Sequence, residues 1–222
     1  MTVDSAPVPF TIAFAEGVTL TRWTGAWAER HRDIPLAFVP VDGETQVSVL
    51  REARADVSFV RLPIERDGLS VIPLYTETPV VVVPKDHPVS LFATVTLADL
   101  ATEDRVPDSL SSADAVELVA AGGGILVLPQ SLARLHARKD VVARPVTDAE
   151  ETHIALAWLE EATTPQIEEF VGIVRGRTAH SSRSPAQPTP AQQPATESKS
   201  RAQPTRRTAA QRPQRPRKSR GR

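Results

Sequence analysis

The stretch 69–88, LSVIPLYTETPVVVVPKDHP, is the feature that most constrains the fold of this chain. It contains two apolar, β-branched runs, at 71–75 and 80–83, separated by the short segment TETP. The four valines at 80–83 are apolar on both faces of a strand, which is typical of a strand covered on both sides. Pro73 interrupts the first run and cannot donate to a neighbouring strand, so we expect an edge strand there. We interpret the stretch as the crossover between two lobes.

Short apolar runs and helical patterns alternate before the crossover. We expect strands at 10–15, 35–41 and 56–63, with helices at about 19–31 (capped by Thr19 or Thr21) and 44–54. This alternation with short links is typical of a parallel sheet. Trp23 and Trp27 share one helical face; they could stack on an aromatic ligand, but we favour an anchor between helix and sheet.

The second half of the chain predicts a smaller set of elements. We expect a helix that begins at Ser111 or Ser112 and ends at the glycines 122–124. Strands at 125–129, 141–146 and 153–159, a short helix at 131–138 and a helix capped by Thr164 complete the pattern. With 222 residues and 41% apolar content, the chain can bury one sizeable core or two small ones in lobes that share a cleft.

Several classes of function are disfavoured by composition and motif. The sequence has no cysteine, and its five histidines lack metal-ligand spacing, so we expect neither a metal nor a cofactor. The three glycines precede a strand, whereas a phosphate-binding loop follows one, and Ser131 lacks the flanking glycines of a nucleophile elbow. No apolar run is long enough to cross a membrane and no signal peptide is visible. We expect a soluble, cytoplasmic protein that is not an enzyme.

The charge is divided unevenly along the chain. Residues 183–222 contain 11 Lys and Arg and one Glu, a net charge of +10, whereas residues 1–182 contain 15 Lys and Arg and 26 Asp and Glu, a net charge of −11. Proline, glutamine, serine and arginine dominate the C-terminal segment, which has no aromatic residue. We therefore expect a flexible N-terminus at 1–9, a folded domain at 10–182 and a disordered basic tail at 183–222.

Three motifs in succession resemble one family. The segments DVSFVRLPIERDGLSVIPLYTETPVVVVPKDHP, TLADLA and DAVELVAAGGGILVLPQS are similar, in order and spacing, to the effector-binding domain of LysR-type transcriptional regulators. The resemblance covers about residues 10–177. It implies a two-lobed α/β fold like that of type II periplasmic binding proteins, a small-molecule cleft between the lobes, and a homodimer.

The sequence departs from this family in two places. We expect no helix-turn-helix before the effector domain, although one precedes it in the family, because the first predicted strand begins at Phe10. The family also has more residues between TLADLA and the following helix, where this chain has only 102–110. We therefore expect a shortened second lobe, with a cleft that is partial or closed.

Ligands of open α/β sheets bind beyond the carboxyl ends of the strands, near helix N-termini. This rule brings 16–21, 42–45, 61–63 and 76–77 to one mouth, with serine hydroxyls from the second lobe. Arg61 could hold a carboxylate of the ligand bidentately, or it could pair with an acidic side chain of the protein. Ser111 and Ser112 are better explained as helix caps than as ligand contacts. The candidate ligand-binding residues are Thr19, Thr21, Arg61, Pro63, Thr76, Glu77, Ser111 and Ser112. The expected ligand is a small carboxylate or aromatic molecule.

The basic tail predicts binding to DNA or another polyanion. Lys and Arg side chains release counterions from a phosphate backbone, which gives sequence-tolerant, salt-sensitive binding. The candidate nucleic-acid-binding residues are Arg206, Arg207, Arg212, Arg215, Arg217, Lys218, Arg220 and Arg222. An AT-hook is weakly indicated, since no proline follows the final Arg-Gly-Arg; a solubility or linker role is the simpler alternative.

Two hypotheses of function follow. In the first, a LysR-like effector-binding domain acts in transcription and its basic tail binds DNA. In the second, the chain is a stand-alone small-molecule-binding or protein-interaction module without a specific role on DNA.

Overall fold

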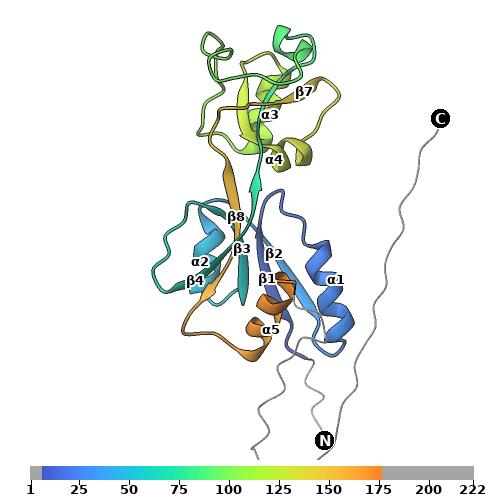
Figure 1. Cartoon of the computed structure of the whole chain (residues 1–222), viewed down its shortest axis with the longest axis vertical. Coiled ribbons are helices and arrows are strands. Elements are labelled where there is room, and N and C mark those ends of the chain that lie inside the picture. Colours follow the sequence, from blue (N-terminus) through green and yellow to red (C-terminus); the bar gives the residue numbers. More distant parts are fainter. Residues whose placement is uncertain (1–6, 177–222) are drawn as a thin grey trace, which may run out of the picture. The chain divides into compact units, whose positions relative to one another are not determined.

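A computed structural model describes residues 7–176 (Figure 1). The predicted tail at 183–222 and its candidate nucleic-acid-binding residues lie outside this range, as does most of the predicted N-terminal segment. The elements in chain order are β1 Phe10–Ala15, α1 Thr21–Arg30, β2 Leu36–Val41, α2 Thr45–Arg51, β3 Val57–Leu62, β4 Leu69–Glu77, β5 Pro79–Pro84, the 3-10 helix η1 Pro88–Leu91, α3 Ser112–Ala120, β6 Leu126–Pro129, α4 Gln130–Leu135, β7 Val141–Pro145, β8 Thr152–Leu159 and α5 Pro165–Val174. No helix within 7–176 is both long and apolar enough to cross a bilayer.

The first lobe is built on a five-stranded mixed sheet. Its strand order is β2-β1-β3-β8-β4; β1 runs parallel to β2 and β3, whereas β8 is antiparallel to β3 and β4. The parallel sheet predicted for the first three strands is therefore confirmed, whereas β8 and β4 make the complete sheet mixed. The reason is that β8 enters this sheet from the second lobe and so runs in the opposite direction. Pro73 lies in the edge strand β4, as predicted.

The core of this lobe is aromatic and joins α1 and α5 to one face of the sheet. The ring of Trp27 stacks on that of Phe10 at 4.7 Å between centroids, and Trp23 stacks on Phe59 at 4.8 Å. Both tryptophans are buried, and Phe170 of α5 packs beside them. The anchor interpretation is therefore confirmed.

The helix termini test the capping predictions one by one. Thr164 caps α5 as predicted, since its Oγ1 accepts a hydrogen bond from the Ile167 amide at 3.3 Å. At α1 the prediction of a threonine cap is wrong: Leu20 occupies the N-cap position and no side chain caps the helix. Helix α2 ends at Arg51, earlier than expected, because Ala53 adopts a left-handed conformation with φ 51°.

The second lobe has a three-stranded antiparallel sheet, in the order β6-β5-β7. The four valines of β5 are buried and divide between two apolar clusters, one on each face of the sheet, as the predicted two-sided burial requires. Only Thr78 separates β4 of the first sheet from β5 of the second, and 146–151 link β7 back to β8. The two lobes are thus joined by two short connections.

The segment 102–110 replaces longer family elements with one short sheet extension. Arg105 forms an isolated parallel bridge with Ile125, next to β6. Gly124 allows this close approach, because a Cβ there would lie 2.6 Å from the carbonyl oxygen of Asp104. Gly122, with φ 80°, follows the C-terminus of α3, so the glycine run is the helix terminator that the sequence predicts.

Candidate ligand-binding site

A cavity of about 700 Å³ lies between the lobes. The first lobe contributes the ends of β1 and β3 and the turn between β2 and α2, which is the carboxyl edge of its parallel strands. The second lobe contributes 108–112 and Leu132. The shortened second lobe therefore still supplies one wall of a cavity.

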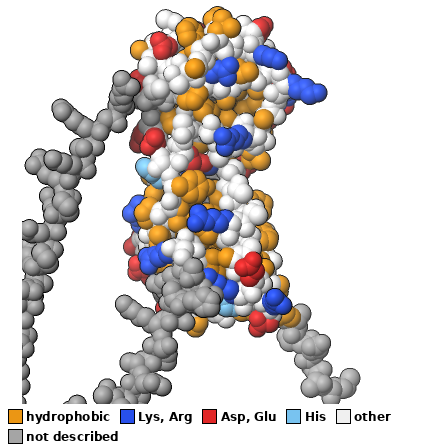
Figure 2. All heavy atoms as spheres, turned by 45° about the vertical axis from the view of Figure 1, so that its right-hand side comes forward, with side chains coloured by type: hydrophobic (Ala, Val, Ile, Leu, Met, Phe, Trp, Pro, Cys, Tyr) orange, Lys and Arg blue, Asp and Glu red, His pale blue; other side chains and the backbone are white. Residues whose placement is uncertain are grey.

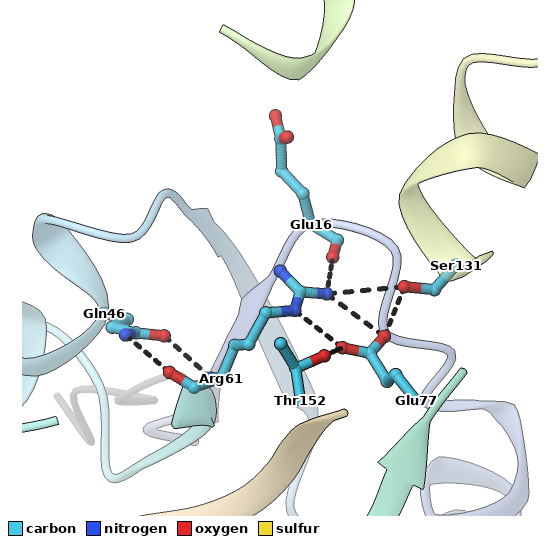
Figure 3. A network of polar contacts seen from close by, with 6 residues as sticks. All are labelled: Glu16, Gln46, Arg61, Glu77, Ser131 and Thr152. Atoms are coloured by element: carbon cyan, nitrogen blue, oxygen red, sulfur yellow. Dashed lines mark hydrogen bonds and ion pairs between the residues drawn. The ribbon is translucent and has the colours of Figure 1, made fainter. Parts of the chain in front are cut away.

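A hydrogen-bond network surrounding Glu77 lies where the lobes join (Figure 3). Arg61, near the end of β3, donates from Nε and Nη2 to the two carboxylate oxygens of Glu77, at 2.6 and 3.2 Å. Ser131 of α4 donates to the same carboxylate, and Thr152 of β8 donates to it at 3.1 Å. Nη2 of Arg61 also donates to the backbone carbonyl of Glu16 at 2.9 Å. The network thus connects both lobes through one buried carboxylate.

Gln46 of α2 fixes the backbone of Arg61. Its amide nitrogen donates to the Arg61 carbonyl at 3.0 Å, and its oxygen accepts from the Arg61 amide at 2.8 Å. Ser58 in turn donates to the carbonyl of Gln46 at 2.9 Å. Gln46 and Ser58 are buried polar residues whose hydrogen bonds are satisfied by these contacts, which tie the backbone of Arg61 in β3 to α2.

Two opposing effects determine the ionisation of Glu77. Burial raises the pKa of its carboxyl, but the hydrogen bonds from Arg61 and Ser131, the arginine charge and the Thr152 hydroxyl together outweigh burial and hold the pKa below its ordinary value. Burial, with a smaller effect of the Glu77 charge, raises the pKa of Tyr75. Glu77 is therefore a carboxylate at neutral pH.

The structure brings half of the candidate ligand-binding residues to the cavity between the lobes. Those that line it are Arg61, Pro63, Ser111 and Ser112. Ser111 is the N-cap of α3, since its Oγ accepts from the Asp114 amide at 3.1 Å and donates to the Asp114 carboxylate at 2.7 Å. Of the two roles considered for Arg61, pairing with an acidic side chain is the one observed.

The other four candidates lie elsewhere. Thr19 lines a second cavity of about 740 Å³, together with Tyr75 and Ser131, and Thr21 begins α1 at a shallow groove beside β2. The hydroxyl of Thr76 lies 3.1 Å from Nδ1 of His153, and Glu77 forms the buried network. The sequence pattern therefore identifies residues near the junction of the lobes but does not separate the cavity lining from the network.

Residues outside the predicted set complete this site. Gln46, Asp108 and Leu110 line the cavity, and Ser131 closes the network from the second lobe. The only available signal for Gln46 was its place in the first turn of the helix expected at 44–54, beside the predicted mouth. Nothing in the local sequence indicates the role of Ser131, because its partner lies 54 residues away in the chain.

A two-lobed α/β domain with two short connections and a cavity between the lobes is the architecture of small-molecule-binding domains of the periplasmic-binding-protein type. The chain belongs to the LysR substrate binding domain family, whose model matches residues 10–112 and 104–179. The two matched segments overlap at 104–112, where the second lobe is shortened. This membership confirms the family and fold expected from the sequence and connects the chain to transcriptional regulation.

Known proteins similar to this chain are regulators. A probable hydrogen peroxide-inducible genes activator of Mycobacterium avium is 28% identical over 139 residues, which are 50% of this chain and 45% of the relative. The effector binding domain of BenM with its effector benzoate is similar in structure, with a TM-score of 0.64 at 22% identity, covering 77% of this chain and 92% of that chain. A hydrogen peroxide-bound mutant of OxyR from Corynebacterium glutamicum has a TM-score of 0.63 at 22% identity, covering 78% and 68%.

The chain spans 33% to 59% of the length of the curated relatives that it matches. These relatives are transcriptional regulators, not enzymes.

Proposed function

We propose that this protein senses a small organic molecule in the cavity between its lobes and thereby takes part in transcriptional regulation, without enzymatic activity. The observation that carries the proposal is the position of the cavity, whose walls come from both lobes. A ligand that contacts both walls stabilises one arrangement of the lobes over others, because it adds binding free energy only where both walls are within reach.

The network of Glu77 supports a role for the junction in this response. Arg61 both lines the cavity and bonds the carboxylate that Ser131 of the second lobe also contacts. A ligand beside Arg61 therefore acts directly on the contact between the lobes. Hydrogen peroxide, which appears in the descriptions of several relatives, is not the proposed ligand, because the 222 residues contain no cysteine whose thiol it could oxidise.

A cavity-filling variant tests this function. Gly43 lines the cavity, and a Cβ built there meets nothing within 4 Å, so Gly43→Trp introduces a large side chain at the cavity wall where there is room for its Cβ. A compound library is screened by thermal shift against the full-length protein; Gly43→Trp should abolish every stabilisation that arises in the cavity. Gly25→Trp, at an equally open position in α1, is the matched control. The proposal would be refuted if no compound stabilised the protein. It would also be refuted if the compounds that stabilise the wild type stabilised Gly43→Trp equally.

We further propose that the basic tail gives the protein sequence-tolerant affinity for DNA. The support is its net charge of +10 over residues 183–222. Mobility shift of duplex DNA by the full chain and by a chain truncated after Ser182 tests this. We expect the logarithm of the binding constant of the full chain to fall with the logarithm of the salt concentration, with a slope of about −0.9 for each phosphate contacted. Equal binding by both chains would contradict the proposal and leave the protein as a small-molecule-binding module without a role on DNA.

A cytoplasmic location and a homodimer belong to the same proposal. Cell fractionation and sedimentation equilibrium test them separately.

A further inference from the structure

We infer that the cavity between the lobes selects an organic cation, a protonated amine, amidine or guanidine on a small apolar frame, and disfavours the carboxylate that the sequence alone suggests. This inference rests on the proposed function, since it names the class of ligand for the same cavity.

The lining of the cavity is acidic. Four carboxylates line it, from Glu16, Asp42, Glu44 and Asp108, and all four side chains belong to exposed residues at its walls. They come from three separate loops of the two lobes, so a ligand between the lobes has carboxylates on both sides. Coulomb attraction of these groups favours a cation and repels an anion over the distances inside such a cavity.

The positive charge at the wall is already neutralised. Within residues 7–176, Arg61 is the one cationic side chain that lines this cavity, and two of its nitrogens bond the carboxylate of Glu77 at 2.6 and 3.2 Å. A ligand carboxylate that claimed the same nitrogens would have to displace a buried carboxylate, which would then lose its charge partner. Nε and Nη2 of Arg61 are therefore occupied, and the charge of the guanidinium is balanced by that of Glu77.

The carboxylates that line the cavity have fewer bonding partners than Arg61 has. In the described part of the chain, the side chains of Glu44 and Asp108 have no hydrogen-bond or ion-pair partner. Glu16 lies 3.9 Å from Nε2 of His136. Asp42 accepts hydrogen bonds from the amides and hydroxyl at 44–45, which lower the pKa of its carboxyl and keep it ionised. Two unpartnered acidic residues thus line the cavity, one from each lobe.

The positive end of α3 opposes this selection only weakly. A helix N-terminus carries about half an elementary charge. Here the Ser111 cap and the carboxylate of Asp114 lie at the start of α3, so part of this positive charge is already compensated. Four full carboxylates outweigh the remainder.

The rest of the lining determines the frame of the ligand. Val41, Leu62 and Pro63 line the cavity from the first lobe, and Leu110 and Leu132 line it from the second. Burial of an apolar ring or chain against them is favourable, because it removes apolar surface from water. An amine with a hydrocarbon body therefore satisfies both the charge and the apolar part of the cavity.

Three probes of one shape test the charge preference with the full-length protein. Benzylamine, benzyl alcohol and benzoate share a ring and differ in charge, and their dissociation constants are measured by ligand-observed NMR at pH 7. We expect benzylamine to bind at least about tenfold more tightly than benzoate, with benzyl alcohol between them. An increase of NaCl from about 20 to about 200 mM should weaken benzylamine binding several-fold, because salt screens exposed charges.

Charge-removing variants locate the effect. Glu44→Gln and Asp108→Asn should each weaken benzylamine binding about three- to tenfold while leaving benzyl alcohol unchanged. Glu161→Gln removes an exposed carboxylate outside the cavity and should change nothing.

The outcomes separate this inference from the proposed function. If benzoate or benzyl alcohol binds as tightly as benzylamine, and Gly43→Trp blocks that binding, the cation preference is overturned while the cavity remains a ligand site. If none of the three probes binds, the inference also fails, and the compound library decides the proposed function independently.

Discussion

The carboxylate of Glu77 is the single group whose removal should most disturb the junction of the lobes. Its residue is only 5% exposed, and the Arg61 side chain that it pairs with is 18% exposed. The loss of one partner from a buried ion pair costs about 3–5 kcal/mol, because the other charge is left without compensation. Arg61 keeps the Glu16 carbonyl and the Ser131 hydroxyl as partners, so the lower end of this range applies to Glu77→Ala.

Glu77→Gln is the sharper test because it preserves the shape of the side chain. The amide oxygen still accepts a hydrogen bond from Arg61, but the charge is gone, so we expect a loss of about 2 kcal/mol in the free energy of unfolding. For a domain of this size, each kcal/mol corresponds to roughly 2–4 °C in Tm, and the shift should be about 4–8 °C. Thermal unfolding followed by tryptophan fluorescence measures it. Glu161→Gln, at an exposed position, should stay within about 0.5 kcal/mol of wild type.

The pH dependence gives an independent readout of the same group. The pKa of Glu77 in the folded protein lies below its ordinary value of 4.5, so the unfolded chain binds the proton first as the pH falls. The stabilisation by this carboxylate is therefore fully present above pH 4.5 and is lost as the pH falls through the lower, folded value. The difference in Tm between wild type and Glu77→Gln should be largest at pH 7 and should narrow below pH 4.5. A difference under about 0.5 kcal/mol at pH 7, or one that is constant with pH, would refute this account of the network.

Three further changes have outcomes that thermal unfolding of the full chain can measure. Gly17→Ala should lower the free energy of unfolding by about 2–3 kcal/mol, since φ is 81° and the new Cβ would lie 2.9 Å from Oγ of Ser131. Gly68→Ala, with φ 68° and open space around the new Cβ, should lower it by about 1 kcal/mol. Equal losses in the two variants would contradict the close contact at Gly17. Ser111→Ala should lose about 1 kcal/mol by removal of the α3 cap, and a stable variant would show that the cap is dispensable. Phe170→Ala should lose about 3–5 kcal/mol, because its fully buried ring packs on three other aromatic rings; a loss below about 1.5 kcal/mol would mean that the core collapses into the space.

Local patterns in the sequence predicted the elements whose environment is simple. The valines of β5 are apolar at every position, and such a strand is stable only when covered on both faces, so its place at the centre of the second sheet followed directly. Pro73 could only be at an edge, and Thr164 followed by proline could only begin a helix. In each case one residue type excludes the alternatives.

The features that sequence reasoning missed depend on contacts between distant segments. Strand β8 is antiparallel to β3 and β4 because the chain enters it from the second lobe. The residues 152–159 alone do not indicate this direction. Leu20 occupies the N-cap of α1 although two threonines flank it, since tertiary packing of Trp23 and Trp27 fixes where the helix begins. The polar network around Glu77 also depends on distant segments. The local sequence of Gln46 and Ser131 does not indicate that they contact Arg61 and Glu77 in the folded chain.

The shortened second lobe shows how a loss of sequence can change a site without removing it. The sequence led us to expect a cleft that is partial or closed, because 102–110 stand in place of a strand and a helix. In the structure this segment adds one bridge to the sheet through Arg105 and then passes along the mouth of the cavity, where it contributes Asp108 and Leu110. An acidic and an apolar residue thus join the cavity lining from the segment in which the chain departs from its family. One of the four carboxylates at the cavity therefore comes from the shortened segment, and replacement of Asp108 is the change that should show whether the departure has altered the class of ligand.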